Sequence, residues 1–452
     1  MIVPAVAAGH PATAAAGAGI LAAGGNAADA AVAAAFVSCV AETVMTGLLG
    51  GAHAIYHDAA SATTRNLDCF VSVPSGEGGA PLQSLHVPFG DELVHYAIGA
   101  SSCAVPGLPA GLDALWRAHG RLPWAELVEP ALDLARSGVA MPRAHASCLA
   151  MLEPVMTMRE GARMYAPHGQ LLGEGDQLQQ PGLIAALELV RDEGAASVYT
   201  GSIAASLLEL VATREGSITA GDLASYAAVW SEPAACTFAG RGIRTRAGLS
   251  GIPETLTQLD PAGGADALLE ALEHEPAIDG HTTNLSVVDR EGNACVLTSS
   301  LGLGSGDWLP GLDLHLNSML GETDLVRAPL RPGARMASMM APTLVFAGDG
   351  LELAIGSAGG TRLRTALVGV LTAVLHDGVP PQAAIDRPRF HPAGHVLNAE
   401  PGVDESWLTR LEGRGREVRR WPERHHYFGG VSAIGRSGAG ADPRRSGAVR
   451  PG

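Results

Sequence analysis

The stretch "HTTNLSVVDREGNACVLTSS", residues 281–300, contains two apolar runs separated by a short polar segment. Valine, leucine and threonine dominate the runs, and these residues fit the pleated, half-buried surface of a sheet. The Glu-Gly-Asn segment at 291–293 is typical of a tight turn. The pattern therefore predicts a β-hairpin with strands at 284–290 and 294–300.

A threonine at the start of the first strand has a chemical use that packing alone does not explain. The hydroxyl of Thr282 is a weak nucleophile, and its own α-amine can activate it only after the preceding peptide bond is cut. Thr282 could cut that bond by attacking the carbonyl of His281, which forms an ester that water then opens. Ser300 would lie opposite Thr282 if the turn falls near 291–292. The segment "GSAGGTR" at 356–362 follows a predicted strand and opens a helix, so its amides could bind an oxyanion.

Each of these features also has an ordinary structural interpretation. Threonine pairs at strand starts are common because threonine favours strands. A Gly-Gly pair before a helix is more often a turn than an oxyanion hole. Ser300 by itself indicates nothing. The residues alone therefore leave the catalytic and the structural interpretation of Thr282 both open.

Composition limits the functions that the chain can have. A hydrophobic fraction of 47% and a charged fraction of 17% are typical of a globular protein. The formal net charge of −16 argues against a nucleic-acid partner, because phosphate would be repelled. All 30 basic residues are arginine, so lysine Schiff bases, pyridoxal enzymes and phosphate-binding P-loops are excluded. We expect neither a cofactor nor a metal.

Cysteine usage and the N-terminal sequence bear on location. The six cysteines are scattered without a CxxC pair, which favours free thiols in a reducing compartment. The first residues lack a basic segment followed by an apolar core, and the Ala-rich run 27–40 is too short to span a membrane. We therefore expect a cytoplasmic protein with no membrane partner.

Outward from residues 281–300, helical patterns dominate before this stretch and strand patterns after it. An alanine-rich helical region, 9–42, is interrupted at Gly24-Gly25-Asn26. Further elements are predicted as strands within 46–74, helices within 101–145 and 182–231, a strand at 236–248, a loop at 249–280 with one short helix around 265–273, strands at 343–347 and 351–356, and a helix at 361–377. No internal repeat or linker divides the chain, so we expect one domain.

Ordered motifs along nearly the whole chain resemble the γ-glutamyltransferase (γ-glutamyltranspeptidase) family of N-terminal nucleophile hydrolases. They include "AAGGNAADAAVAAA", "TGLLGGAHAIYHDAAS", "GHTTNLSVVDREGNACVLTSSLG", "ARMASMMAPTLV", "GSAGGTRL" and "GADPRRSGA". The resemblance implies an α+β fold, a four-layer αββα sandwich in which helices cover two stacked, mainly antiparallel sheets. It also implies that a single domain, 1–452, cuts itself between His281 and Thr282.

The resemblance further implies partners and roles. Fragments 1–281 and 282–452 would form a heterodimer that acts on a small-molecule acyl substrate, and a higher oligomer is left open. Thr282 would be the nucleophile, Ser300 would support it, and Gly359 and Gly360 would form the oxyanion hole.

The chain departs from the family where the glutamyl group binds. The family arginine that grips the α-carboxylate is replaced by Phe70, and a phenyl ring cannot form that fork. The family asparagine after the supporting hydroxyl becomes Gly302, and the family serine pair becomes Ser338-Met339. The acidic residue that holds the substrate's amine falls at Glu322. Together with Met319, these residues predict an apolar pocket in which γ-glutamyl compounds bind poorly.

The leading hypothesis is a self-processing threonine hydrolase that cleaves an amide or C–C bond of a non-γ-glutamyl substrate. The expected setting is specialised metabolism, such as antibiotic or 4-alkylproline biosynthesis. One alternative is a true γ-glutamyltransferase or glutathione hydrolase with a relocated carboxylate anchor, for which Arg335 and Arg362 are candidates. A second alternative is an inactive binding relative. The pair His425-His426 beside Glu423 lacks zinc-site spacing, so a solvated surface is favoured there.

Overall fold

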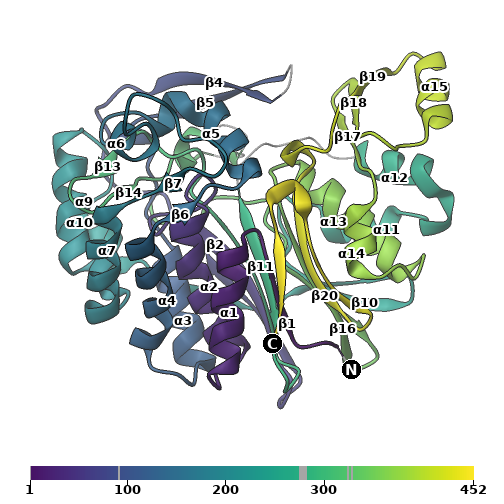
Figure 1. Ribbon diagram of the computed structural model, residues 1–452, viewed down its shortest axis with the longest axis horizontal. Helices are drawn as coiled ribbons and strands as arrows, with labels where there is room; N and C mark the ends of the chain where they lie inside the picture. The colour runs from purple at the N-terminus through teal and green to yellow at the C-terminus, as the bar shows by residue number, and fades with distance from the viewer. Residues whose placement is uncertain (1, 90–91, 274–281, 323–324, 327–328) are drawn as a thin grey trace.

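Two antiparallel sheets form the centre of the protein, in a computed structural model that describes residues 2–89, 92–273, 282–322, 325–326 and 329–452 (Figure 1). The first sheet has seven strands in the order β22 (Ala448–Pro451), β1 (Ala5–Ala8), β11 (Thr283–Val288), β12 (Ala294–Ser300), β2 (Gly51–Asp58), β3 (Thr63–Cys69) and β8 (Val229–Ser231). The second has six, in the order β21 (Gly438–Ala441), β20 (Gly430–Gly435), β16 (Gly350–Ala358), β15 (Thr343–Ala347), β10 (Arg241–Thr245) and β9 (Ala234–Phe238).

The sheets stack face to face and helices cover both outer faces. Buried aliphatic side chains from both sheets, including Ile55, Val296, Leu344 and Ile434, form the layer between them. Helices α1 (Pro11–Ala22), α2 (Ala27–Ala41), α3 (Leu108–His119), α4 (Trp124–Ser137), α7 (Pro181–Glu193) and α9 (Ser202–Thr213) lie on the side of the first sheet. Helices α11 (Ile252–Gln258), α12 (Gly264–Glu273), α13 (Arg362–Leu375) and α14 (Pro381–Asp386) lie on the side of the second. The predicted four-layer αββα sandwich is therefore confirmed.

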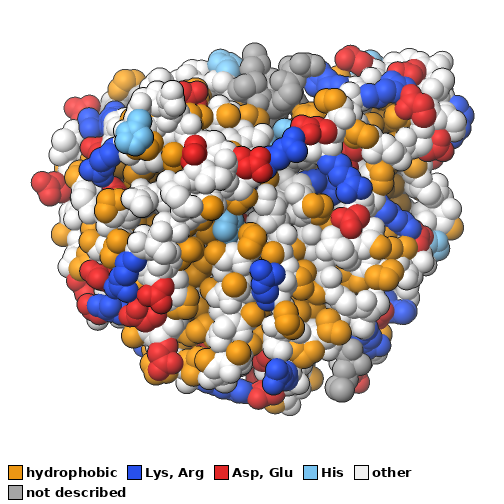
Figure 2. Space-filling model, in the orientation of Figure 1, with side chains coloured by type: hydrophobic (Ala, Val, Ile, Leu, Met, Phe, Trp, Pro, Cys, Tyr) orange, Lys and Arg blue, Asp and Glu red, His pale blue; other side chains and the backbone are white. Residues whose placement is uncertain are grey.

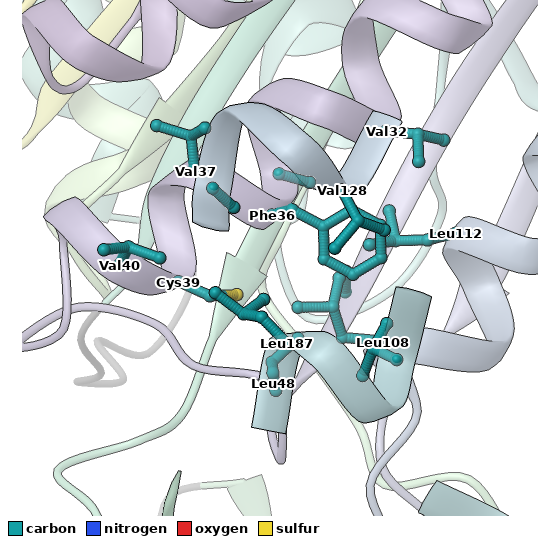
Figure 3. Close-up of a cluster of buried hydrophobic side chains, with 14 of the residues drawn as sticks. Val32, Phe36, Val37, Cys39, Val40, Leu48, Leu108, Leu112, Val128 and Leu187 are labelled. Atoms are coloured by element: carbon teal, nitrogen blue, oxygen red, sulfur yellow. The ribbon is translucent and has the colours of Figure 1, made fainter. Parts of the chain in front are cut away.

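Helix α2 is buried on all sides because its residues are almost all small and apolar. Phe36 is surrounded by aliphatic side chains of neighbouring helices, among them Leu112 and Val128 (Figure 3). The predicted break at Gly24-Gly25-Asn26 is confirmed. The Asn26 side chain caps α2, and the Asp29 carboxylate accepts a hydrogen bond from the backbone N–H of Asn26, which completes a capping box.

Several elements differ from the sequence-based predictions. The predicted strand at 236–248 is a hairpin, β9–β10, because the chain turns at Ala239-Gly240, where both residues have positive φ. Part of the predicted loop is helix α11, which starts after the left-handed Gly251 and buries Ile252 and Leu256. The hairpin β4 (Gln83–Phe89) and β5 (Glu92–Ile98) was not predicted. Also unpredicted is a small sheet of β17 (Phe390–Ala393), β18 (Val396–Ala399) and β19 (Glu417–Arg420).

One helical stretch, Ala196–Thr213, is long and apolar enough on composition alone to cross a membrane. It consists of two helices, α8 (Ala196–Tyr199) and α9, and the apolar side chains Ile203, Leu207 and Val211 of α9 are buried in the helical layer. The stretch therefore serves as part of the core.

Strands from both sides of residue 282 alternate in the first sheet. β1 lies between β11 and β22, and β12 pairs with β2. A chain cut before Thr282 would therefore leave two fragments that share both sheets. Residues 274–281, including His281, lie outside the described residues, so the division into 1–281 and 282–452 stays a prediction.

Candidate active site

The hairpin β11–β12 holds Thr282 at one end of the first sheet. Thr283 pairs with Ser299, and the same register continued by one residue places Thr282 opposite Ser300. The turn is fixed by the Asp289 carboxylate, which accepts hydrogen bonds from the backbone and side chain of Asn293 at 2.9 and 2.8 Å. The register predicted from the turn position is therefore confirmed.

The second sheet brings a glycine pair against Thr282. The N–H of Gly359 donates a hydrogen bond to Thr282 Oγ1 at 2.7 Å. Gly359 and Gly360, between β16 and α13, have φ angles of +125° and +60°. Residues other than glycine rarely adopt a φ of +125°. A Cβ at Gly359 would lie 2.8 Å from the Cα of Gly429, so the position also lacks space for a side chain. Thr282 and the glycine pair thus meet where the two sheets end.

Ser300 and Gly302 continue the site from the end of β12. Ser300 Oγ accepts a hydrogen bond from the N–H of Gly302 at 3.0 Å. A Cβ at Gly302 would lie 2.5 Å from Glu322 Oε1 and 2.7 Å from Ser318 Oγ. The carboxylate of Glu322 therefore fills the space that a side chain at position 302 would need.

A mainly apolar pocket opens beside Thr282, and we call it the acyl pocket. Its lining comprises Phe70, Thr282, Ser300, Met319, Glu322, Leu325, Ser338, Met339, Met340, Gly360 and Leu363. The structure thus brings together the residues predicted from the sequence, except that Gly302 lies behind Glu322 and Gly359 contacts Thr282 without lining the pocket. No arginine or histidine is present among the described lining residues.

Phe70 is held firmly in the wall of the acyl pocket. The residue is 1% exposed, and its ring stacks on His53 with centroids 5.4 Å apart. Its carbonyl accepts hydrogen bonds from Tyr226 Oη at 2.6 Å and from Arg335 Nη1 at 3.1 Å. A Cβ at Gly51 would lie 2.9 Å from the ring, so strand β2 packs closely against Phe70 at this position.

Neither arginine suggested as a replacement anchor lines the acyl pocket. Arg335 lies over the Tyr226 ring, 4.2 Å from its centroid, and its Nε is 3.6 Å from the Asp68 carboxylate. Arg362 donates to the carbonyl of Tyr427 at 3.2 Å and lies over that ring. Both guanidinium groups therefore have structural contacts outside the pocket.

A second, smaller cavity borders Thr282, and we call it the rear cavity; most of its lining residues carry polar or charged side chains. Its lining comprises Gly9, Glu42, Met45, His145, Thr282, Thr283, Asn284, Ala358, Gly430, Val431, Ser432, Asp442 and Arg445. The charged residues of this cavity were not predicted from the sequence. The only signal for them was that Arg445 falls in the motif "GADPRRSGA" and that Glu42 ends the alanine-rich helix.

Glu42 is a fully enclosed carboxyl group in the rear cavity. It accepts a hydrogen bond from Thr13 Oγ1 at 2.6 Å and another from Thr283 Oγ1. Burial raises its pKa to about 7, while the two hydroxyl groups and Arg445 act in the opposite direction. His145, which lines the same cavity, has its pKa lowered to about 3 by burial. The group that can change charge near neutral pH in this cavity is therefore Glu42.

The histidine pair weighed as a metal site has other contacts. His425 Nδ1 accepts a hydrogen bond from the N–H of Tyr427 at 3.2 Å, and Glu423 pairs with Arg143 at 2.9 Å. Within the described part of the chain, no group of three or more histidine, cysteine, aspartate or glutamate side chains is arranged to hold a metal. Charged side chains of both signs are interspersed on the face shown in Figure 2.

Comparisons with known proteins show the family of the chain. The family model described as gamma-glutamyltranspeptidase matches residues 13–259 and 253–452. Glutathione hydrolase proenzyme 1 of Schizosaccharomyces pombe is 26% identical, over 93% of this chain and 79% of its own length. The acylase ACY 1 proenzyme of Pseudomonas sp. (strain V22) is 27% identical, over 94% of this chain and 88% of its own.

Solved structures show the same fold. Cephalosporin acylase from Bacillus halodurans superposes with a TM-score of 0.84 at 23% identity, covering 99% of this chain and 96% of its own. The family match spans almost the whole sequence, and the fold and the hairpin–glycine arrangement agree with it. The chain belongs to the γ-glutamyltranspeptidase family and is an enzyme of the N-terminal nucleophile hydrolase type.

Proposed function

We propose that this protein is a self-processing threonine hydrolase whose acyl donor is not a γ-glutamyl compound. The observation that carries the proposal is the acyl pocket, which places Thr282 among one phenylalanine, three methionines and two leucines, with no arginine or histidine among its described lining residues. An α-carboxylate would lose its hydration there without gaining a cationic partner, which is costly.

Processing starts with attack by Thr282 Oγ1 on the carbonyl carbon of residue 281. The peptide nitrogen of Thr282 takes up a proton and leaves as a free amine, and the acyl group now sits on the hydroxyl as an ester. Water hydrolyses this ester and restores the hydroxyl. The new chain end supplies the base that the hydroxyl lacked.

In turnover, the free amine of Thr282 accepts the hydroxyl proton as Oγ1 bonds to the carbonyl carbon of the donor. The N–H of Gly359 donates to Oγ1 at 2.7 Å before the reaction, so the N–H groups of Gly359 and Gly360 lie next to the attacked carbonyl and would stabilise the oxyanion that forms there. The intermediate collapses to an acyl-enzyme, and the leaving group departs with the proton. Water then releases the acid. The leaving group can be an amine or a stabilised carbanion, so both amide and C–C substrates fit this sequence of steps.

The apolar lining indicates the class of acyl group. Met319, Met339 and Met340 have flexible, polarisable side chains that adapt to irregular apolar groups. A donor with an aliphatic or aromatic acyl chain would fill this pocket. Acylase relatives within the family support this assignment, and we place the reaction in specialised metabolism, such as antibiotic or 4-alkylproline biosynthesis.

A matched set of 4-nitroanilides tests the proposal. We expect processed enzyme to hydrolyse the hexanoyl or phenylacetyl anilide with a kcat/KM at least tenfold above that of the γ-glutamyl anilide. Thr282→Ala is the control and should be inactive on all three. Preference for the γ-glutamyl anilide would overturn the proposal.

The alternative, a γ-glutamyl enzyme with a relocated anchor, is favoured by one contact. Arg246 Nη1 donates a hydrogen bond to the carbonyl of Ser338, a lining residue, at 2.8 Å. If this guanidinium binds the carboxylate of a donor, Arg246→Met should raise KM for the γ-glutamyl anilide alone. An equal change in KM for all three anilides would indicate that Arg246 has only a structural role.

A further inference from the structure

The rear cavity contains a buried arginine and a buried glutamate, and each of them contacts the chain at Thr282 or Thr283. Arg445 Nη1 donates a hydrogen bond to the carbonyl of Thr282 at 3.4 Å, and Glu42 accepts one from the hydroxyl of Thr283. Both side chains are buried, and each contributes to the electrostatic environment of the other. Two consecutive residues, 282 and 283, are thus contacted by a buried guanidinium and by a buried carboxyl group.

The guanidinium of Arg445 also lies beside the oxyanion-binding peptide. A Cβ at Gly359 would lie 3.1 Å from Arg445 Nη2, so the positive charge is next to the residue that donates to Thr282 Oγ1. The stem of Arg445 packs on Gly430, where a Cβ would lie 2.3 Å from Arg445 Cγ. Arg445 Nη1 also contacts Met45 Sδ at 3.1 Å. These contacts restrict the conformation of the Arg445 side chain.

The side chain of Glu42 is also held in place by its neighbours. Its second oxygen bonds Thr13 on α1, and a Cβ at Gly9 would lie 2.6 Å from Glu42 Oε2 and 2.8 Å from Thr283 Oγ1. The absence of a side chain at position 9 is therefore required for the contact between the carboxylate and Thr283.

We propose that Arg445 and Glu42 are positioning residues for the reaction: the pair holds Thr282 and Thr283 in register with the glycine pair, and Arg445 adds positive charge behind the oxyanion hole. This inference rests on the proposed role of Thr282 as nucleophile. It does not involve the acyl pocket, which lies on another side of Thr282 and shares only that residue with the rear cavity.

The test uses a neutral double variant, Glu42→Gln with Arg445→Met. The double variant removes both ionisable side chains together, so that neither is left facing a substituted partner in the cavity. We measure the rate of self-cleavage, and then kcat and KM per processed active site with an apolar acyl anilide. We expect both rates to fall 10- to 100-fold while KM stays within twofold of wild type.

A matched control tests whether any lost buried pair has this effect. Arg444 and Glu400 form a neighbouring, completely buried pair, with Nε to Oε1 at 2.6 Å. The double variant Glu400→Gln with Arg444→Met removes these charges without touching residue 282 or 283. Asp442, which lines the rear cavity, loses its contact with the Arg444 guanidinium but keeps the one with Arg389 at 2.6 Å. Its kcat per processed site should stay within twofold of wild type.

Arg445→Lys provides a second measurement if the double variant does not fold. Lysine keeps the charge but cannot reach Thr282 and the region of Gly359 together, so kcat should fall without a change in KM. The proposal is overturned if either variant retains wild-type kcat per processed site, or if the control loses as much. Failure of the proposed function is distinct, because it would appear in the unmodified enzyme as preference for the γ-glutamyl anilide.

Discussion

The acyl pocket and the rear cavity both border Thr282, yet they differ in almost every other respect. The acyl pocket is lined by methionine, leucine and phenylalanine side chains, with Glu322 as its one acidic residue among those described. The rear cavity is lined by Glu42, Asp442, Arg445 and several hydroxyl groups. One region would recognise the acyl group, and the other would hold the machinery that attacks it.

This separation allows the acyl pocket to change without a change in the rear cavity. Residues such as Phe70 and Met339 can be exchanged without touching the contacts of Glu42 or Arg445. The reverse does not hold, because the rear contacts fix the strand on which Thr282 lies. Substitutions on the two sides should therefore give different kinetic signatures.

The largest effect should come from Thr282 itself, where the two regions meet. Thr282→Ala removes the only hydroxyl that the proposed mechanism uses, so self-cleavage should cease and turnover should fall at least about 10⁴-fold. Gel electrophoresis and an anilide assay measure both. Thr282→Ser keeps a hydroxyl and should still yield fragments of residues 1–281 and 282–452. Normal cleavage of the alanine variant would contradict the proposed mechanism.

Gly359→Ala should have the next largest effect. The new methyl group would approach Gly429, and a φ of +125° strains any side chain, so the N–H must move away from Thr282 Oγ1. Loss of one oxyanion donor commonly lowers kcat by about 10²–10³. The matched control is Gly369→Ala in α13, where nothing lies within 4 Å of the added carbon. If both variants lose the same activity, the N–H of Gly359 has no special role.

Glu42 should give the rear cavity a pH dependence near neutrality. Its pKa is raised from 4.5 to about 7, mainly by burial, so between these pH values the folded chain holds a proton that the unfolded chain has released. The contribution of Glu42 to stability is therefore greatest at low pH and declines as pH rises from 4.5 to 7.

Denaturant unfolding of uncleaved Thr282→Ala, with and without Glu42→Gln, measures this contribution. We subtract the unfolding free energy of the protein with Glu42 from that of the Gln variant. This difference should increase by up to about 3 kcal/mol between pH 4.5 and 7, and it should remain constant above pH 8. Arg445, Cys39 and His145 lie near Glu42 but are common to both proteins, so their titration largely cancels. Parallel pH curves would refute the shift.

Met339→Ala should give the smallest effect, confined to the acyl pocket. Losing the thioether side chain removes part of the apolar contact, so kcat/KM for an apolar acyl anilide should fall about tenfold. Met336→Ala is the control, because Met336 packs in the same buried cluster but does not line the pocket. An equal loss in both variants would indicate general destabilisation instead of a lost substrate contact.

The sequence predicted those parts of the site that depend on neighbouring residues. The turn at 291–293 sets the register that places Ser300 opposite Thr282, and a strand followed by two glycines and a helix is a local pattern. Glu42 and Arg445 could not be predicted in this way. They lie near opposite ends of the chain, and only the stacking of the two sheets brings both to Thr282 and Thr283.

Arg335 is a residue to which the sequence suggested a role that its contacts in the folded chain do not support. Its place in a motif beside the pocket residues suggested a replacement carboxylate anchor. In the folded chain its guanidinium contacts Asp68, Phe70 and Tyr226. The direction of a long side chain depends on tertiary contacts, which the local sequence does not contain.

The measurement that tests the central claim most directly is intact-mass analysis of the enzyme mixed rapidly with an apolar acyl anilide. We predict a fragment that begins at Thr282 and gains the mass of the acyl group, with the adduct located on residue 282 by peptide mapping. Active enzyme that remains a single 452-residue chain, or an acyl group found on any other residue, would contradict the account.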